Sequence, residues 1–361
     1  MNFDINKIPH INEIANNGSF NGARSKNTET FQQRCSDCNK IVPSLEEAIK
    51  KSGLRDGMTI SFHHHFRNGD HIINNVLDKL AEMGFKNLTL AASSLSAVHA
   101  PLIEHIRSGL ITHIETSGLR GELAEQISRG LMDFPVVFRS HGGRASAIRS
   151  GELHIDVAFL GAPSCDPYGN ANGYSRDDDD GISCGSLGYA RTDAEFADKV
   201  IIITNNIVSY PNAPWAIPEH DVDYVVRVDD IGDPKGIMSG ATRYTKDPKE
   251  LLIAKTAANV VEAAGYLYDG FSMQMGSGGA SLATARFIRQ KMLDKGIRCR
   301  FALGGITGQI TAMHEEGLID RILDVQSFDL DAAKSLKNNH FHHQISATYY
   351  ACLLYTSDAA D

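Results

Sequence analysis

The sequence predicts an α/β fold in which two similar, open and mainly parallel sheets follow one another, the second of them incomplete. Short apolar runs alternate with amphipathic stretches along most of the chain, a pattern typical of βαβ units. The 361 residues are 42% hydrophobic and 22% charged, close to the globular average, which excludes a disordered, collagen-like or coiled-coil chain. This length corresponds to about two domains.

The first domain is expected over residues 46–235, after an irregular polar arm over residues 1–45. Its clearest helix is expected at 71–84, because six apolar residues there fall on one helical face and Gly84 ends the pattern. Asp70 is the expected N-cap of this helix. The other expected elements are helices over 96–108 and 121–130 and strands over 58–62, 87–91, 111–115, 136–138, 157–161, 200–204 and 224–228.

The second domain is expected over residues 236–351. It opens with a helical pattern over 250–265 that carries a face of small residues. The remaining expected elements are a strand over 271–275, a helix over 280–295, and strands over 299–303 and 324–328. Residues 352–361 are expected to be a non-native tail.

An internal repeat links the two domains. Asp56-Gly57 precedes the first strand of one unit and Asp269-Gly270 that of the other, 213 residues later. The tripeptide Gly-Leu-Ile recurs at 109–111 and 317–319, an offset of 208 residues. The small difference between these offsets is ordinary loop variation. Only 93 residues follow from Asp269 onward, so the second sheet is expected to be incomplete, with an open edge and an uncovered apolar face.

Charge and composition narrow the function. The net charge of −9 argues against general nucleic-acid binding. No run of 18 or more apolar residues is present and no signal peptide is visible, so a cytoplasmic protein that does not enter membranes is expected. Six cysteines in 361 residues fit a reducing compartment better than a disulfide scaffold.

Two glycine-rich segments are candidate binding loops. One covers 276–281 between a strand and a helix, and the other covers 303–309 at the end of the next strand. Glycines let a backbone approach a ligand closely, and free N–H groups at a helix start suit an anion or a carbonyl oxygen. The carboxyl ends of neighbouring parallel strands share one crevice, so the pair is more specific than either loop. The alternative for the first is a tight strand–helix turn.

Histidines and arginines mark two further strand ends. His63, His64 and His65 precede Arg67, but consecutive strand residues point to opposite faces, so a metal site is disfavoured. A polar lining for a carboxylate, or structural histidines, are the alternatives. Arg139 and His141 lie after a later strand, close to Arg144 and Arg149, and suggest a di- or tricarboxylate site. Ordinary surface arginines are the alternative for this second group.

Other candidates carry weaker signals. Cys165 follows a buried strand as a possible nucleophile, but no base is identifiable beside it. Cys35 and Cys38 have no second pair at zinc spacing, and residues 177–180 are expected to be a solvated acidic loop. No metal site is therefore expected in this chain.

Long strings of the sequence resemble citrate lyase alpha chains. The strings cover residues 61–70, 85–94, 161–166, 184–189, 274–284 and 338–341. The resemblance extends over about residues 15–351 and is specific because it rests on strings and not on single motifs. It implies the coenzyme A-transferase class, which is built from two similar open α/β domains. It also implies that the family continues beyond residue 351.

The resemblance implies a transferase reaction in a complex. An acetyl thioester on the acyl-carrier γ subunit exchanges its acyl group with citrate, which gives a citryl thioester and free acetate. The β subunit then cleaves the citryl thioester. The coenzyme A-like prosthetic group belongs to the γ subunit, so no covalent cofactor is expected in this chain, and Mg²⁺ is a candidate ion for the complex. The alternatives are another acyl-CoA:carboxylate CoA-transferase and a non-catalytic assembly subunit.

The resemblance also suggests site residues. Many coenzyme A-transferases carry a glutamate nucleophile in a turn that corresponds here to Leu303-Gly304-Gly305, where no glutamate is present. Direct attack by a citrate carboxylate is therefore expected, with backbone N–H groups stabilising the oxyanion. The expected oxyanion and thioester-positioning residues are Gly278, Gly279, Gly304 and Gly305. The expected substrate-binding residues are His63, His64, Arg67, Arg139, His141, Ser277 and Ser281.

Overall fold

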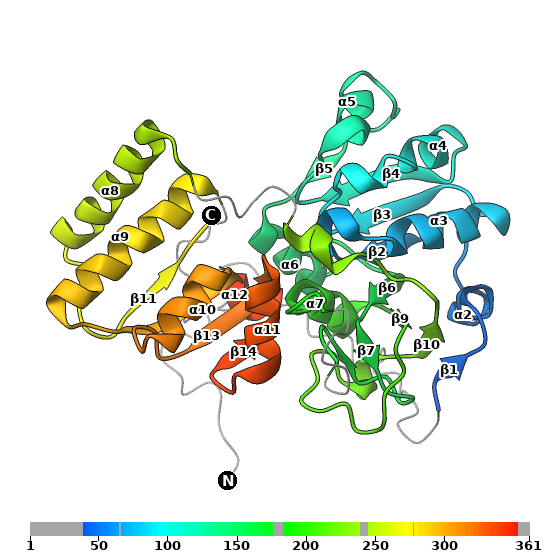
Figure 1. Cartoon of the computed structure of the whole chain (residues 1–361). Coiled ribbons are helices and arrows are strands. Elements are labelled where there is room, and N and C mark those ends of the chain that lie inside the picture. The colour runs from blue at the N-terminus through cyan, green and yellow to red at the C-terminus, as the bar shows by residue number, and fades with distance from the viewer. Residues whose placement is uncertain (1–38, 65, 176–182, 239–244, 277, 353–361) are drawn as a thin grey trace, which may run out of the picture.

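A computed structural model describes residues 39–64, 66–175, 183–238, 245–276 and 278–352. Within these ranges the chain forms two lobes, each built on its own parallel sheet (Figure 1). The larger lobe runs from blue to green in Figure 1 and the smaller one from yellow-green to red. None of the helices in the described ranges is both long and apolar enough to cross a membrane.

The larger lobe is built on an eight-stranded sheet with the order β1-β10-β9-β6-β2-β3-β4-β5, and all neighbouring strands are parallel. In chain order these strands are β1 Ile41–Val42, β2 Thr59–Phe62, β3 Leu88–Ala92, β4 Ile111–Thr116, β5 Val137–Phe138, β6 Val157–Gly161, β9 Lys199–Thr204 and β10 Tyr224–Arg227. Central strand β6 is buried throughout, and Phe159 stacks on Phe62 of β2 at 5.5 Å between ring centroids. The main core lies around these central strands.

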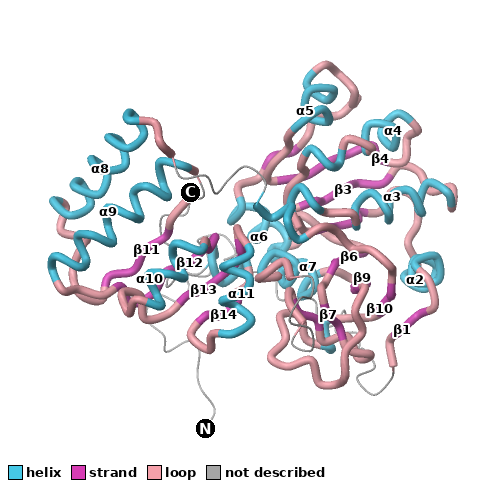
Figure 2. Tube along the Cα trace, viewed as in Figure 1, coloured by secondary structure: helices cyan, strands magenta, loops and turns pink. Residues whose placement is uncertain are grey.

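Helices cover the sheet of the larger lobe. They are α2 Leu45–Ser52, α3 Ile72–Glu82, α4 Leu102–Arg107, α5 Gly121–Ser128, α6 His141–Ser150 and α7 Gly188–Phe196. Single 3₁₀ turns lie at η3 Arg67–Gly69, η4 Ala97–His99, η5 Glu219–Asp221 and η6 Pro234–Met238, and β7 Ser164–Cys165 pairs antiparallel with β8 Ala171–Asn172. Helices α6 and α7 lie on the side that faces the smaller lobe (Figure 2).

The smaller lobe is a four-stranded parallel sheet with the order β11-β12-β13-β14. Its elements are α8 Pro248–Ala263, β11 Phe271–Gln274, α9 Gly279–Lys295, β12 Cys299–Ile306, α10 Gly308–Glu315, β13 Ile322–Ser327, α11 Leu330–Asn338, β14 His342–Gln344 and α12 Ala347–Cys352. Among the described residues, β11 is an edge strand, whereas its counterpart β2 has a neighbour on both sides. Leu252, Ile253 and Val260 of α8 are exposed.

The two lobes repeat the same local geometry, as the sequence predicts. Strands β2-β3-β4-β5 and β11-β12-β13-β14 have the same order and direction. Asp56 Oδ1 accepts a hydrogen bond from Lys86 N–H at 2.9 Å, and Asp269 Oδ1 accepts one from Arg298 N–H at 2.8 Å. The glycine after each aspartate has a positive φ, 85° at Gly57 and 87° at the equivalent position. These matched turns explain why the Asp-Gly pair recurs in the sequence.

Several expected boundaries differ from the structure. Strand β12 continues to Ile306, beyond the expected end at residue 303, because its glycines remain in the ladder and shift the register between Gly304 and Gly305. The segment expected as one helix over 96–108 is divided into η4 and α4 at Pro101. The N-cap position of α3 is His71, although Asp70 Oδ2 still accepts a hydrogen bond from Ile73 N–H at 3.2 Å.

Helices α6 and α7, like α2, α11 and α12, have no counterpart among the expected elements. Helices α6 and α7 are rich in glycine, serine or charged residues that hide the helical period, and they are held by packing between the lobes. The expected N-terminal arm includes β1 and the start of α2 in its described part, while residues 1–38 lie outside the described residues. Of the expected tail over 352–361, Cys352 is the last residue of α12, and residues 353–361 lie outside the described residues.

Candidate active site

A pocket of about 240 Å³ lies where the carboxyl ends of the two sheets meet, and we call it the interlobe pocket. In an open parallel sheet this edge is where ligands bind. The larger lobe contributes side chains that follow β2, β3 and β4, namely His64, Arg67, Ser94, Ser96, Ser117 and Arg120. The smaller lobe contributes Gln274, Gly276, Gly305, Gln326, Phe328 and Tyr350. His141 of α6 and Tyr189 of α7 complete the polar lining.

The lining of the interlobe pocket is positive. Arg67 and Arg120 both line it, and no aspartate or glutamate is among the described residues that do so. The Arg67 guanidinium is buried, donates one hydrogen bond to the Ile237 carbonyl at 3.2 Å, and lies over the Phe328 ring at 5.0 Å. Within the described ranges neither arginine forms an ion pair with a carboxylate. Two arginines without a neutralising carboxylate favour an anionic ligand.

The backbone holds Arg67 in an unusual place. Its φ is +53°, a conformation that residues with a Cβ rarely adopt, and it opens the 3₁₀ turn η3. Burial first, and the positive charge of Arg120 second, lower the pKa of Arg67. The strained backbone and the buried charge both indicate a functional position.

His64 ties the two lobes together. Its Nδ1 lies 2.5 Å from the Ser93 Oγ, and its Nε2 lies 3.0 Å from the Gln326 Oε1 of β13. Gln326 Nε2 in turn donates to the His64 carbonyl oxygen at 3.3 Å. Burial, followed by the charges of His141 and Arg67, lowers the pKa of His64 well below its ordinary value. His64 is therefore neutral, with its proton on Nε2, where it donates to Gln326.

Aromatic side chains line another part of the interlobe pocket. Tyr189 lies against His64 at 5.4 Å and against His141 at 5.5 Å between ring centroids. Burial raises the pKa of Tyr189, so its hydroxyl stays protonated. Burial, followed by Arg120 and Arg144, lowers the pKa of His141. From the smaller lobe, Gln274 Nε2 donates a hydrogen bond to the Tyr350 hydroxyl.

The glycines expected to stabilise an oxyanion fall into two groups. Gly305 lines the interlobe pocket, and Gly304 lies beside it with a φ of +99°. A side chain at Gly304 would approach Tyr350 at 3.2 Å, and one at Gly305 would meet the Phe328 ring at 1.9 Å. Gly278 is the N-cap of α9 and Gly279 its first residue, and neither lines the pocket.

The expected substrate-binding residues also divide. His64, Arg67 and His141 line the interlobe pocket. His63 points the other way, and its Nε2 lies 3.0 Å from the Gly161 carbonyl oxygen in the core. Burial lowers the pKa of His63 to about 4. Arg139 is paired with Glu115 at 2.8 Å and with Glu152 at 3.0 Å, outside the pocket lining.

Ser281 is half-buried, and its Oγ lies 3.0 Å from the position that a Cβ at Gly276 would take. Ser281 does not line the interlobe pocket. Ser277 and His65 lie outside the described residues, as do Cys35, Cys38 and residues 177–180. Burial raises the pKa of the Cys165 thiol well above its ordinary value, which disfavours it as a nucleophile.

Several lining residues were not expected from the sequence. Arg120, Ser96 and Ser117 follow strands β3 and β4, so the strand-end rule applied to these loops would have found them. Gln326 and Tyr350 carry no local signal. They reach the pocket because β13 and α12 pack against the larger lobe.

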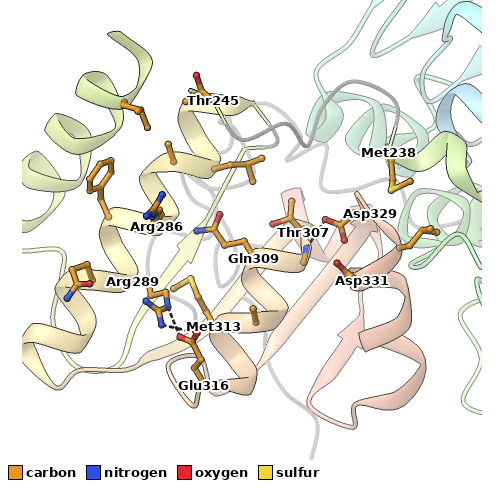
Figure 3. A pocket seen from close by; sticks show the side chains of 18 residues that line it. Met238, Thr245, Arg286, Arg289, Thr307, Gln309, Met313, Glu316, Asp329 and Asp331 are labelled. Atoms are coloured by element: carbon orange, nitrogen blue, oxygen red, sulfur yellow. Dashed lines mark hydrogen bonds and ion pairs between the residues drawn. The ribbon is translucent and has the colours of Figure 1, made fainter. Parts of the chain in front are cut away.

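A second and larger cavity, of about 1250 Å³, lies among α9, α10 and α11 (Figure 3). Its charges are mixed, since Arg289 pairs with Glu316 at 2.6 Å and Asp329 accepts a hydrogen bond from Gly308 N–H at 2.8 Å. Burial raises the pKa of Asp329. Met238 lines this cavity and follows Ile237, whose carbonyl oxygen accepts the hydrogen bond from Arg67. Thr307 also lines it and lies two residues after Gly305 of the interlobe pocket. The two cavities are therefore neighbours.

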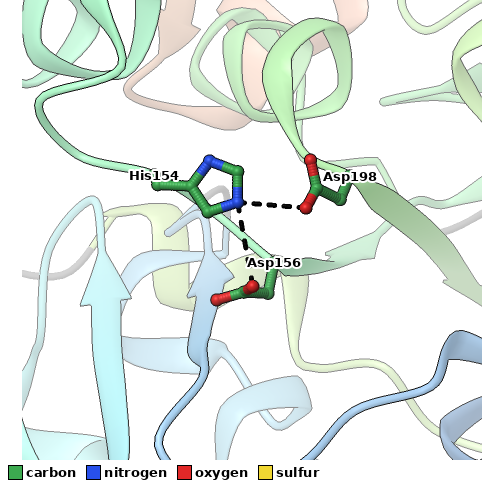
Figure 4. A group of neighbouring side chains, drawn as sticks. All are labelled: His154, Asp156 and Asp198. Atoms are coloured by element: carbon green, nitrogen blue, oxygen red, sulfur yellow. Dashed lines mark hydrogen bonds and ion pairs between the residues drawn. The ribbon is translucent and has the colours of Figure 1, made fainter. Parts of the chain in front are cut away.

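A histidine and two aspartates form a cluster at the amino ends of the central strands β6 and β9 (Figure 4). His154 Nε2 lies 3.0 Å from Asp198 Oδ2 and 3.7 Å from Asp156 Oδ1. Asp156 Oδ2 also accepts a hydrogen bond from Thr59 N–H at 2.7 Å. His154 and Asp198 are exposed, and these contacts account for the cluster as surface ion pairs.

Comparisons with known proteins place the chain in a family context. The sequence model of the family described as "Citrate lyase, alpha subunit (CitF)" matches residues 38–360. The citrate lyase alpha chain of Haemophilus influenzae is 58% identical over 312 residues, which are 86% of this chain and 62% of that protein. This chain therefore spans about 62% of the length of the curated relatives it matches.

Solved structures agree with the fold. The alpha subunit of citrate lyase from Streptococcus mutans, solved in complex with citrate, has a TM-score of 0.82 and 55% identity over 87% of this chain and 61% of that chain. A 4-hydroxybutyrate CoA-transferase from Porphyromonas gingivalis has a TM-score of 0.54 and 17% identity over 85% of this chain and 67% of that chain. The expected fold class, with its coenzyme A-transferase-type sheets, is confirmed.

Proposed function

Because the chain belongs to the citrate lyase alpha subunit family, we propose that it transfers the acyl-carrier thioester from acetate to citrate. In this reaction an acetyl thioester and citrate give a citryl thioester and acetate. The observation that carries the proposal is the interlobe pocket, where Arg67 and Arg120 line a small polar cavity and no described lining residue is acidic. The Streptococcus mutans relative, which was solved with citrate, supports the choice of anion.

The proposed chemistry has two steps and needs no protein nucleophile. A citrate carboxylate oxygen attacks the acetyl carbonyl, and the carbon–sulfur bond breaks. The carrier thiolate departs, and a mixed anhydride of acetate and citrate remains. The thiolate then attacks the citryl carbonyl of the anhydride, and acetate leaves with the electron pair. Every charge is balanced without a net proton transfer. The chain supplies position and electrostatic stabilisation.

The proposed roles of the residues follow their positions. Arg67 holds a citrate carboxylate, and His64 and His141 add polar contacts from the same wall. His64 is neutral, so it adds polarity to this wall without adding a charge. Backbone N–H groups of Gly304 and Gly305 are proposed for the oxyanion, since Gly305 lines the pocket. Gly278, Gly279, His63, Arg139, Ser277 and Ser281 remain predictions.

The proposal includes partners. The carrier γ subunit brings the acetyl group on its coenzyme A-like prosthetic group, and the β subunit cleaves the citryl thioester, with Mg²⁺ as a candidate ion of the complex. The larger cavity beside the interlobe pocket has room for a long carrier arm. We place the complex in the cytoplasm, which fits the free, buried Cys165, Cys184 and Cys299.

The test is transfer by the reconstituted complex, with the longest form of the subunit that its gene encodes. Acetate and citryl-carrier should appear in equal amounts. Arg67→Gln should lower kcat/KM for citrate about 100-fold, as loss of a buried charge pair does. Arg129→Gln, a change at the exposed C-cap residue of α5, is the matched control.

Each outcome separates the candidates. Transfer to acetate or another monocarboxylate, with no use of citrate, would favour a different acyl-CoA:carboxylate CoA-transferase. Assembly of the complex without any transfer would favour a non-catalytic subunit.

A further inference from the structure

We propose that Arg120 and Arg67 form a two-guanidinium clamp in the interlobe pocket, in which Arg120 selects polycarboxylates over monocarboxylates. This inference rests on the proposed transfer to citrate and names the residue that distinguishes the two carboxylates of that reaction. Both arginines line the same small pocket, and Arg120 lies in the loop between β4 and α5.

The two arginines differ in burial, and this difference assigns their roles. Arg67 is 9% exposed and is held by the Ile237 carbonyl and the Phe328 ring. A carboxylate that pairs with Arg67 is therefore shielded from water, which strengthens the attraction. Arg120 is exposed at the rim, where a pair gains less from the charge and must also order a long side chain. The first carboxylate of any ligand therefore goes to Arg67.

Backbone hydrogen bonds hold the loop that carries Arg120. Arg120 N–H donates to the Leu95 carbonyl at 3.1 Å, and Leu95 N–H donates to the Gly118 carbonyl at 2.8 Å. The loops after β3 and β4 are thus joined, with Ser96 and Ser117 on the pocket wall. The buried Ser117 Oγ has no hydrogen-bond partner among the described residues. A ligand that spans the pocket meets neutral donors between two cations.

This arrangement has a consequence for the exchange. Acetate has one carboxylate and can pair with Arg67 alone, so it leaves Arg120 without a partner. Citrate has three carboxylates and can satisfy both arginines while one carboxylate reacts. The clamp therefore retains the substrate and releases the product, because only the polycarboxylate gains the second pair.

The experiment measures equilibrium binding to the longest form of the subunit that its gene encodes. Citrate and propane-1,2,3-tricarboxylate are titrated by calorimetry, and acetate is measured by competition against citrate. Arg120→Gln should weaken both tricarboxylates about fivefold, as loss of an exposed pair does, and leave acetate affinity unchanged. Arg120→Lys should recover part of the affinity, because it restores the charge without the fork. Arg67→Gln should weaken all three ligands, and Arg129→Gln none.

Two results would overturn the clamp alone. In one, Arg120→Gln leaves citrate affinity unchanged. In the other, it weakens acetate by the same factor as citrate, so that Arg120 supplies only general positive charge. Failure of the unaltered protein to bind citrate would instead overturn the proposed function and the clamp with it. Because Arg120 is exposed, its variants should fold, and a circular dichroism spectrum identical to that of the parent protein checks this.

Discussion

Two adjacent histidines show how one residue step changes a role. His63 and His64 follow β2, and they point to opposite sides of the sheet edge. His63 contacts the Gly161 carbonyl in the core, while His64 faces Gln326 across the interlobe pocket. Burial keeps both rings neutral. The same residue type is thus structural at one position and part of the candidate site at the next.

The burial of His63 predicts that acid destabilises the protein before ordinary carboxylates titrate. The pKa of His63 is about 4 when folded, against 6.5 as its ordinary value. Between these two pKa values, His63 is therefore protonated in the unfolded chain and neutral in the folded protein. Stability is full above pH 6.5 and falls as the pH drops toward 4, by about 3 kcal/mol for this residue. Urea unfolding at pH steps across this window measures the change.

His63→Gln is the control, because its amide can still donate to the Gly161 carbonyl but cannot titrate. Its unfolding free energy should depend less on pH than that of the parent, since only His64 and the other groups remain. An equally steep pH dependence in both proteins would rule out His63 as the source.

At the scale of elements, β12 connects the repeat to the site. In the first lobe the equivalent strand β3 ends at Ala92, whereas β12 keeps its glycines in the ladder until Ile306. The register shift between Gly304 and Gly305 re-aims the strand toward the pocket. Phe328, which follows the neighbouring strand, occupies the space beside Gly305 and supports Arg67. The absence of a side chain at Gly305 thus leaves room for the Phe328 ring, which supports Arg67 of the other lobe.

Gly305→Ala should therefore damage the site more than the fold. The new Cβ would lie 1.9 Å from the Phe328 ring, so the ring must move and Arg67 loses its support. We expect about 1–3 kcal/mol of destabilisation from overpacking and at least about a tenfold loss of citrate affinity. Arg300→Ala, an exposed change in the same strand, should alter neither quantity. Thermal melts and citrate titrations measure both, and unchanged citrate affinity in Gly305→Ala would contradict this link.

At the scale of the whole molecule, the pocket exists because two lobes are held together closely. The start of α7 lies against the smaller lobe, where Ser186 Oγ donates to the Asp324 carbonyl at 2.7 Å. The Oγ1 of Thr192 in α7 lies 3.2 Å from the Oγ1 of Thr348 in α12. Together with the contact between His64 and Gln326, these contacts join the two lobes. Figure 1 shows α7 beside β13 and α12 at this junction.

Gly188→Ala tests this junction. A Cβ at Gly188 would lie 2.3 Å from the Ile345 carbonyl oxygen and 2.6 Å from that of Val325. Both are backbone atoms that a rotamer change cannot move, so the lobes must separate. We expect a loss of about 1–3 kcal/mol of stability and weaker citrate binding. Glu195→Ala on the exposed side of α7 serves as the comparison, and differential scanning calorimetry with citrate titration gives the readout. Full citrate affinity in Gly188→Ala would show that the pocket does not need this contact.

Local patterns in the sequence determined much of the fold. The apolar run over 157–161 coincides with β6, and the helical period over 280–295 differs from α9 by one residue. These segments were predictable because short-range periodicity decides which face is buried. The Asp-Gly and Gly-Leu-Ile recurrences identified the repeat for the same reason, since each marks a turn with a fixed backbone conformation.

The tertiary structure alone decided which of the candidates share a pocket. His64 and Gln326 are 262 residues apart, and no local pattern specifies their contact. Arg139 and Arg120 both follow strands of the large sheet, yet Arg139 is neutralised by Glu115 while Arg120 lines the pocket. A sequence shows which residues lie at strand ends. The packing of one lobe on the other selects those that face a ligand, because that depends on long-range contacts and on the direction of each side chain.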